Sequence, residues 1–475
     1  MGKVAAAISF TNVSFRYPEE KGFALGNINI NIPAKSFTLL LGPTGCGKTT
    51  LLTLARGFAK EYGGKFEGKI EVSGQDINKY TIGQLGQFIG LIFQNPATQL
   101  HQLRVIDEVA SAPLYQGQPY EQAIEKSRRL VKQILGENFT NRSTTELSGG
   151  QQQKVALAAT LSLDAQILLL DEPFSFLDSS SCEEIIKILV GLHKQGKTIV
   201  VATHSPAKIA LFADLAILID KGEVVLTGQP RDVFNHKRFD QILGSQIKSK
   251  TKNKPYQKQR PILSAEGIAF TYPTGHGIYD ISLNVYQGEI LGIIGPNGSG
   301  KSTLARLLIG LLKPKKGKVI FKGQDITRQP VWQRAGEIGY VTQDPLDMLF
   351  ESSVFDEAAF GPKIRKSPDF EKQATEALEL VGLLPFGQKH PDSLSGGQKN
   401  LLSIADILAN DPEVLILDEP EFGLDPKTWG NIANHLLDLK SLGKTVIIIT
   451  QDLGKVLPIC DRSVIIKDGK IEKIL

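Results

Sequence analysis

Four short apolar runs in the chain each end at residues that suit a functional loop. Residues 37–41 and 290–294 lead directly into glycine-rich segments, and residues 167–170 and 414–417 lead into two acids followed by proline. Apolar runs of this length without polar alternation predict strands that are buried on both faces, as in a parallel sheet. The residues behind each glycine-rich segment read as a helix, so we expect the order strand, loop, helix.

The chain contains the same series of motifs twice. GPTGCGKT at residues 42–49 returns as GPNGSGKS at 295–302, LSGGQ at 147–151 returns at 394–398, and LLLDEP at 168–173 returns as LILDEP at 415–420. One duplication of a unit of about 230 residues explains this order. We therefore predict an α/β protein with domains at residues 6–240 and 262–475, joined by a basic linker at 241–261.

The segment between the copies is polar and basic. Residues 248–261 show no hydrophobic periodicity, which predicts a solvated linker, and about 20 such residues reach roughly 25 Å, enough for the two halves to face each other. Contact of these basic residues with anionic lipid is an alternative. No signal peptide or apolar run of about 18 residues is evident, so any membrane path is expected in other chains.

Composition narrows the possible partners. The 475 residues are 41% hydrophobic and 22% charged, as in an ordinary globular protein, and a net charge of +4 is too weak to indicate nucleic-acid binding. The three cysteines, Cys46, Cys182 and Cys460, have spacings that fit neither a disulfide framework nor a zinc site. Buried or inert thiols in a reducing cytosol are expected.

The two glycine-rich segments have the form GxxxxGK[ST] between a strand and a helix. In that setting backbone N–H groups wrap phosphates at a positive helix end, Lys48 or Lys301 reaches the outer phosphates, and Thr49 or Ser302 holds magnesium. Occurrence in both halves argues against simple glycine turns. The residues expected to bind ATP here are Gly42, Pro43, Thr44, Gly45, Cys46, Gly47, Lys48, Thr49 and Thr50, and Gly295, Pro296, Asn297, Gly298, Ser299, Gly300, Lys301, Ser302 and Thr303.

The acid pairs at the ends of the other two apolar runs suit phosphoryl transfer. Asp171 and Asp418 are expected to act on Mg²⁺, usually through its water. Glu172 and Glu419 are placed to polarise the attacking water. ATP and Mg²⁺ are therefore the expected ligands of both halves.

LSGGQ together with paired phosphate loops and DEP strands resembles the ATP-binding-cassette (ABC) ATPases over nearly the whole chain. The resemblance implies two P-loop domains, each with a mainly parallel sheet, a small antiparallel β subdomain and a helical subdomain. It also implies head-to-tail pairing, in which each ATP lies between the phosphate loop of one half and the LSGGQ of the other. Ser148 and Ser395 would cap a helix whose positive end faces an anion. The residues concerned are Ser148, Gly149, Gly150 and Gln151, and Ser395, Gly396, Gly397 and Gln398.

The same resemblance implies roles for pairs of single residues. Tyr17 and Tyr272 match the aromatic residue that stacks on adenine. Gln94 and Gln343 match the glutamine that senses magnesium and borders the contact with a membrane subunit. Further matches are the acids that link the two sites, Asp178 and Asp425, and the switch residue that contacts the γ-phosphate, His204 in the first half and Gln451 in the second.

Glutamine at position 451 departs from the family pattern. Because glutamine can donate a hydrogen bond but cannot carry positive charge, we hypothesise that the site built on Lys301 hydrolyses ATP more slowly. Lys154, just past LSGGQ, has its counterpart in Leu401, a change that borders the other site. Harmless drift after duplication is the alternative to unequal sites.

QNPATQL after Gln94 and FDEAAFGP in the second half resemble patterns of energy-coupling-factor transporter ATPases. This resemblance implies a peripheral protein on the cytoplasmic face of the cell membrane. Its expected partners are a transmembrane scaffold subunit and a small membrane subunit that binds a vitamin, a vitamin precursor, or cobalt or nickel. A soluble tandem ATPase of translation, or a fused sugar-importer ATPase, is the alternative. The expected activity is ATP hydrolysis coupled to transport.

Overall fold

The computed structural model describes residues 5–18, 20, 22–59, 61–175, 177, 179–206, 209–244, 247, 260–273, 275–394, 396–421 and 423–475. It forms two compact units, one made almost entirely of the residues up to Gly244 and one of those that follow. This division falls inside the predicted linker, whose residues 248–259 lie outside the described part. The predicted outer limits of the domains stay predictions.

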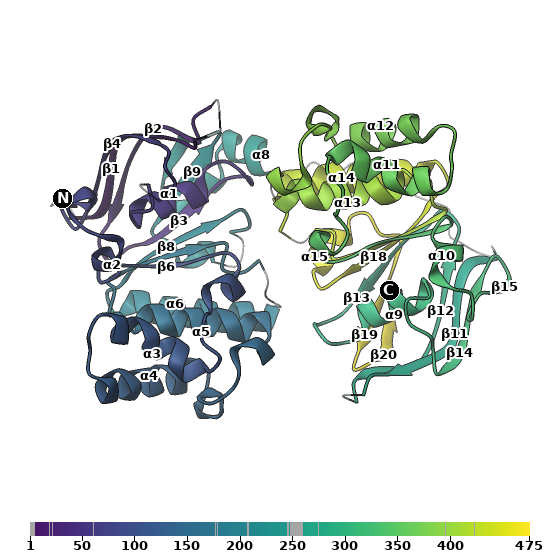
Figure 1. Cartoon of the computed structure of the whole chain (residues 1–475), viewed down its shortest axis with the longest axis horizontal. Helices are drawn as coiled ribbons and strands as arrows, with labels where there is room; N and C mark the ends of the chain where they lie inside the picture. The colour runs from purple at the N-terminus through teal and green to yellow at the C-terminus, as the bar shows by residue number, and fades with distance from the viewer. Residues whose placement is uncertain are drawn as a thin grey trace. The chain divides into compact units, whose positions relative to one another are not determined.

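The first unit contains two sheets (Figure 1). The smaller, antiparallel sheet has the order β2-β1-β4-β5, and the larger has the order β10-β9-β3-β8-β7-β6. In the larger sheet β9, β3, β8, β7 and β6 run parallel, and β10 pairs antiparallel with β9. The strands are β1 (Ala6–Arg16), β2 (Leu25–Pro33), β3 (Phe37–Leu41), β4 (Lys65–Val72), β5 (Gln75–Asp76), β6 (Ile89–Ile92), β7 (Ile167–Asp171), β8 (Thr198–Thr203), β9 (Leu215–Asp220) and β10 (Glu223–Gly228).

Helices and the antiparallel sheet cover opposite faces of this larger sheet (Figure 1). Alternate residues of β3 enter different cores: Leu39 and Leu41 face the core shared with α3 to α6, and Leu40 faces the core shared with α1 and β1. Burial on both faces explains why the run lacks polar alternation. The helices are α1 (Lys48–Ala55), α2 (Ile82–Leu85), α3 (Val105–Tyr115), α4 (Tyr120–Ile134), α5 (Gly149–Leu161), α6 (Ser179–Lys194), α7 (Pro230–Phe234) and α8 (Lys237–Leu243), with short 3₁₀ helices at Ile77–Lys79, Pro96–Gln99, Glu137–Phe139, Thr144–Glu146 and Ala210–Phe212.

The second unit has the same plan. Its antiparallel sheet has the order β12-β11-β14-β15, and its larger sheet has the order β16-β17-β18-β13-β19-β20, with β20 antiparallel to β19 and the others parallel. The strands are β11 (Pro261–Thr271), β12 (Gly277–Tyr286), β13 (Ile290–Ile294), β14 (Lys316–Phe321), β15 (Gln324–Asp325), β16 (Ile338–Val341), β17 (Val414–Asp418), β18 (Thr445–Thr450), β19 (Arg462–Lys467) and β20 (Lys470–Ile474).

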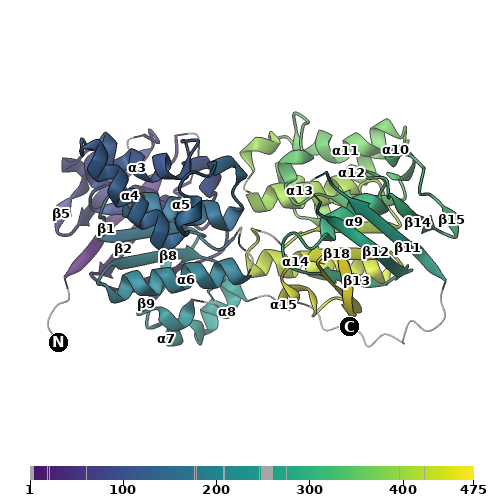
Figure 2. The same cartoon turned by 90° about the horizontal axis from the view of Figure 1, so that it is seen from below.

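Three apolar cores hold the second unit together. Leu415 and Leu417 of β17 face the core beneath α14, and Ile416 faces the core shared with α9 and β11. A third core lies among α11, α12 and α13, which cluster in Figure 2. The helices are α9 (Lys301–Leu308), α10 (Val331–Arg334), α11 (Val354–Ile364), α12 (Phe370–Leu380), α13 (Gly396–Leu408), α14 (Pro426–Ser441) and α15 (Leu453–Val456), with 3₁₀ helices at Pro345–Asp347, Leu384–Phe386 and Pro391–Ser393.

The structure bears on two expectations from the sequence, which concern the cysteines and membrane-spanning helices. The three cysteines all lie within the described residues, where they are buried and form no disulfide. None of the helices in the described ranges is both long and apolar enough to cross a membrane.

Candidate functional site

Both glycine-rich segments form the predicted loop between a buried strand and a helix. The helices α1 and α9 begin at the lysines, and the residues before them, Gly47 and Gly300, have φ angles of 103° and 101°. A Cβ on Gly47 would lie 2.7 Å from Leu25 Cδ2, and a Cβ on Gly300 would lie 2.5 Å from Ile278 Cγ2. Glycine is therefore required both by the backbone conformation and by the space.

Each loop lysine folds back over its own loop. Lys48 Nζ donates to the carbonyls of Gly42 at 2.7 Å and Pro43 at 3.0 Å. Lys301 Nζ makes the same contacts with Gly295 at 2.9 Å and Pro296 at 3.1 Å. Burial lowers the pKa of Lys301, against the opposing effect of nearby carboxylates. The ammonium group thus lies beside the helix start, where an anion would bind.

The first acid of each pair has an oxygen without a partner. Thr49 Oγ1 donates to Asp171 Oδ2 at 2.6 Å, and Tyr340 OH donates to Asp418 Oδ2 at 3.0 Å. The other oxygens, Asp171 Oδ1 and Asp418 Oδ1, are buried and accept no hydrogen bond from the described residues. Burial raises the pKa of Asp171 to about 6, although the Thr49 hydroxyl acts in the opposite direction. A buried carboxylate oxygen beside a hydroxyl fits a hard cation such as Mg²⁺.

The second acid of each pair sits at an unusual backbone position. Glu172 and Glu419 have φ angles of 44° and 53°, a left-handed conformation that is uncommon outside glycine. Their N–H groups donate to Ala202 O at 2.9 Å and to Ile449 O at 2.8 Å. Both side chains are buried. Strained backbone of this kind clusters at functional sites, and here it directs each carboxylate toward its phosphate-loop lysine.

The two glutamates have different partners. Glu172 Oε1 lies 2.8 Å from His204 Nδ1 and 3.6 Å from Lys48 Nζ. The Thr203 side chain is a further polar neighbour of this carboxylate and has a smaller effect in lowering its pKa. Burial by itself would raise the pKa of Glu172. The hydrogen bond with His204 and the charges of His204 and Lys48 together have a larger effect, so the pKa of Glu172 lies below its ordinary value. Glu419 Oε1 lies 3.8 Å from Lys301 Nζ, and burial raises the pKa of Glu419 to about 7.

The Gln451 carbonyl oxygen is buried without a hydrogen-bond donor in the described structure. The structure brings His204 to Glu172, a contact that the sequence did not predict, and the contact of His204 with the γ-phosphate stays a prediction. The contribution of Thr203 was missed as well. No motif marks Thr203, because its contact depends on strands β7 and β8 lying side by side.

The LSGGQ segment of the first half begins α5 with a capping box. Ser148 Oγ accepts the N–H of Gln151 at 3.4 Å, and Gln151 Oε1 accepts the N–H of Ser148 at 3.1 Å. The predicted serine cap is thereby confirmed. Ser395, the matching residue, and Asp178 lie outside the described residues, although α13 begins at Gly396.

The remaining predicted residues lie around these loops. Tyr17 OH lies 3.1 Å from Thr50 Oγ1, and the Tyr17 ring packs edge-on against Phe15. Tyr272 is half-buried just behind β11 and hydrogen-bonds Arg306. Asp425 is buried and accepts the N–H of Lys427 at 3.1 Å.

The two glutamines Gln94 and Gln343 follow β6 and β16 and are exposed. A residue that sequence reasoning did not single out, Gln99, fixes the loop behind Gln94. Its side chain donates to Leu91 O at 2.8 Å and accepts the N–H of Phe93 at 3.1 Å. Its place in QNPATQL was the available signal.

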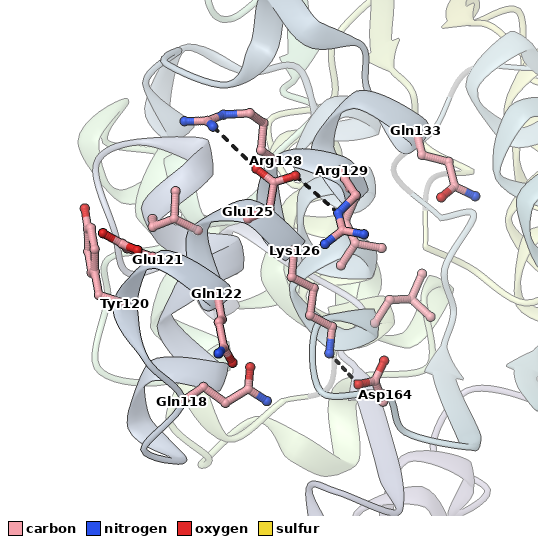
Figure 3. Close-up of a pocket in the computed structure, with 13 residues that line it drawn as sticks. Gln118, Tyr120, Glu121, Gln122, Glu125, Lys126, Arg128, Arg129, Gln133 and Asp164 are labelled. Atoms are coloured by element: carbon pink, nitrogen blue, oxygen red, sulfur yellow. Dashed lines mark hydrogen bonds and ion pairs between the residues drawn. The ribbon is translucent and has the colours of Figure 1, made fainter.

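A cleft of about 340 Å³ opens directly behind Gln94. It lies between β6, α3 and α5 and is lined mainly by apolar side chains, including Phe58, Phe93, Leu100, Tyr115 and Ala159. A larger, open hollow lies along α4 (Figure 3). Ion pairs of Glu125 with Arg128 and Arg129, and of Lys126 with Asp164, join residues of its lining. No phosphate-loop residue lines it, so we assign it no ligand.

Comparison with known proteins agrees with this geometry. The family model described as ABC transporter matches residues 25–175 and 278–421. A protein of Methanosarcina mazei with the provisional name of ABC transporter ATP-binding protein is 30% identical over 98% of this chain and 88% of its own length. A protein of Treponema denticola with the same provisional name is 34% identical over 98% of this chain and 97% of its own.

Among solved structures, cbiO1 of Clostridium perfringens, described as part of the ABC transporter complex cbiONQ, is 36% identical over 46% of this chain and 88% of its own, with a TM-score of 0.43. The family model matches both halves, and each matched range contains the phosphate loop and the acid pair described above. The chain therefore belongs to the ABC transporter family, as an ATP-binding subunit built from two tandem ABC ATPase domains that hydrolyse ATP.

Proposed function

We propose that this ATPase is the energy-coupling subunit of an energy-coupling-factor importer. Its partners would be a transmembrane scaffold and a small membrane protein that binds a vitamin, a vitamin precursor, or a cobalt or nickel ion. The observation that carries the proposal is the apolar cleft behind Gln94. It begins at the segment whose sequence, QNPATQL, resembles that importer class.

The cleft suits a helix from a membrane subunit. Its walls are apolar and aromatic, and at its edge Tyr115 is 86% exposed. Exposed aromatic side chains beside an apolar cleft are typical of protein interfaces, since they gain most from burial. Glu108, also in the lining, accepts the N–H groups of His101 and Gln102 at 2.7 Å, which fixes the loop that forms one wall.

We propose the following roles in the first half. Glu172 holds a water for attack on the γ-phosphate, and His204 and Lys48 keep its carboxylate ionised at neutral pH. Lys48 and the N–H groups at the start of α1 bind the phosphates. Thr49 and Asp171 would hold Mg²⁺, which neutralises charge on the phosphates when bound. Tyr17 and Gln94 would complete this half's part of the nucleotide site, Ser148 would contact the ATP held by the phosphate loop of the other half, and Asp178 would link the two sites.

The corresponding residues of the second half are Tyr272, Lys301, Ser302, Gln343, Asp418, Glu419, Gln451 and Asp425, with Ser395 in the signature motif. We propose that each ATP binds between the phosphate loop of one half and the LSGGQ of the other, and that the site built on Lys301 turns over more slowly. Closing on ATP and reopening after hydrolysis would then move the cleft and its membrane partner.

The importer proposal is tested by purifying the tagged chain from membranes of its own organism and identifying what accompanies it by mass spectrometry. We expect a polytopic membrane scaffold and a small membrane protein. Ribosomal proteins in their place would favour the translation alternative, and a substrate-binding protein with sugar permeases would favour the sugar importer. Either result would overturn the proposal.

A variant that fills the cleft sharpens this test. Ala159→Trp is expected to abolish recovery of the scaffold while ATP turnover of the isolated chain changes by less than about two-fold, because Ala159 lies in the cleft wall and not at the phosphate loop. The matched control, Gln122→Trp in the hollow along α4 (Figure 3), should leave recovery of the scaffold unchanged. Equal recovery with both variants would show that this cleft is not the docking site.

A further inference from the structure

A buried carboxylate in the second half has no counterpart in the first. The residue two positions after the catalytic glutamate is Phe174 in DEPF but Glu421 in DEPE. Phe174 packs against the apolar core of its unit. Glu421 is 3% exposed, and its Oε2 has no hydrogen-bond partner within the described structure. A buried, incompletely satisfied carboxylate is costly, so its presence beside a catalytic site calls for an explanation.

Glu421 is hydrogen-bonded to the hydroxyl of Thr450, the last residue of β18. The Thr450 hydroxyl donates to Glu421 Oε1 and accepts the N–H of Asp452 at 2.9 Å. In the first half the matching residue, Thr203, accepts the N–H of Ser205 at 3.1 Å, and its side chain lies close enough to the carboxylate of the catalytic Glu172 to help lower its pKa. A hydroxyl has one proton to donate, so Thr450 cannot serve Glu421 and Glu419 together.

Two differences between the halves therefore act on the same glutamate. Replacement of the histidine by Gln451 removes one partner of the Glu419 carboxylate. The second difference is Glu421, which accepts the hydrogen bond of the Thr450 hydroxyl, so that this hydroxyl no longer donates to Glu419. Lys301, at 3.8 Å, is the remaining partner that the described structure shows for Glu419 Oε1. The left-handed backbone of Glu419 is retained, which leaves its side chain near the loop but poorly fixed.

We propose that Glu421 is a positioning residue that takes the Thr450 hydroxyl away from Glu419 and thereby slows ATP hydrolysis in the site built on Lys301. This inference rests on the unequal sites proposed above and is independent of the importer partners. It predicts that the Lys301 site is slow because the Thr450 hydroxyl donates to Glu421 and not to Glu419. Removing the Glu421 carboxylate should therefore raise the activity of this site.

The test uses the full chain carrying Glu172→Gln, so that the remaining turnover comes from the Lys301 site. Adding Glu421→Leu is expected to raise kcat about five-fold, the kinetic equivalent of one net hydrogen bond of about 1 kcal/mol, with KM for ATP changed less than about two-fold. Adding Thr450→Val to that variant should return kcat to its starting value, because the gain passes through this hydroxyl. Glu421→Gln, which keeps an acceptor for Thr450, should gain less than Glu421→Leu.

The reciprocal change provides a second measurement. In the full chain carrying Glu419→Gln, Phe174→Glu is expected to lower kcat of the first site, and Thr203→Val should lower it as well. If Glu421→Leu does not fold, Thr450→Val alone decides: its kcat in the Glu172→Gln chain should be unchanged, in contrast to Thr203→Val in the other half.

Several results would overturn the proposal. It fails if Glu421→Leu leaves kcat unchanged or lowers it, or if its gain persists without the Thr450 hydroxyl. Equal losses from Glu172→Gln and Glu419→Gln in the parent chain would instead reject the unequal sites, and the Glu421 series would still report whether the hydroxyl is diverted.

Discussion

The glutamates proposed as general bases, Glu172 and Glu419, share a backbone conformation and differ in what surrounds the carboxylate. Glu172 has His204, Lys48 and the Thr203 side chain as neighbours, whereas the one contact that the described residues give Glu419 Oε1 is Lys301 Nζ at 3.8 Å. A general base works best when it is ionised and held in one orientation, and the partners of Glu172 favour both. We therefore expect the residues around each carboxylate, more than the glutamate itself, to set the rate of each site.

This contrast predicts unequal effects of one substitution made in each half. Glu172→Gln should lower steady-state ATP turnover by at least about ten-fold, since it removes the better-supported base, and Glu419→Gln should lower it by less than about two-fold. Turnover by the purified chain with saturating ATP and Mg²⁺ measures both. The inverse ranking would assign the fast site to the second half, and equal losses would mean that the two sites work as one.

At the scale of elements, apolar runs and glycine loops predicted β3, β7, β13 and β17 and the helices behind them, because burial on both faces and phosphate binding leave direct marks in sequence. The serine cap of α5 was predictable for the same reason, since capping chemistry is local. The contacts of Thr203 and Glu421 were not predictable. Each joins residues whose partner is chosen by strand order or helix packing, which no single motif encodes.

One such contact joins α11 and α13. Glu357 of α11 is fully buried and accepts the N–H groups of Phe350 and Glu351, and its Oε1 lacks a partner among the described residues. Asp406 of α13 lies near it, in the place that Ala159 has in the first half. Burial, with a smaller effect of Glu357, raises the pKa of Asp406 to about 7. Two acids packed together in this way oppose folding when both are ionised.

Asp406→Asn is therefore expected to stabilise the second unit in a pH-dependent way. The unfolded chain releases the Asp406 proton near pH 4 and the folded chain near pH 7, so the folded state binds more protons between these values and stability falls as pH rises through that window. The gain from the substitution should be absent below about pH 4 and reach about 1 to 3 kcal/mol above pH 7. Chemical unfolding at pH 4.5 and pH 8 measures the difference.

Glu376→Gln on the exposed face of α12 is the matched control, because its side chain is 64% exposed and should contribute little at either pH. A gain for Asp406→Asn that is as large at pH 4.5 as at pH 8 would show that the effect is not a matter of ionisation.

For the whole molecule, the consequence of carrying both ATPase domains on one chain is kinetic. If ATP binds between the two halves, joining them makes their pairing intramolecular, with an effective concentration commonly in the millimolar range for short linkers. Turnover per chain should then be independent of protein concentration. A protease site inserted within residues 248–259 and cut after folding removes the connection while both halves stay in solution.

We expect the uncut protein to keep its specific activity on dilution from micromolar to nanomolar concentrations, and the cut protein to lose activity progressively over the same range, because pairing has become bimolecular. The same chain with Lys48→Ala and Lys301→Ala should show no turnover in either form, which separates cassette activity from contamination. Activity of the uncut protein that falls on dilution would mean that two chains pair with each other. Activity of the cut protein that survives dilution would mean that each half works alone, and the composite sites would have to be abandoned.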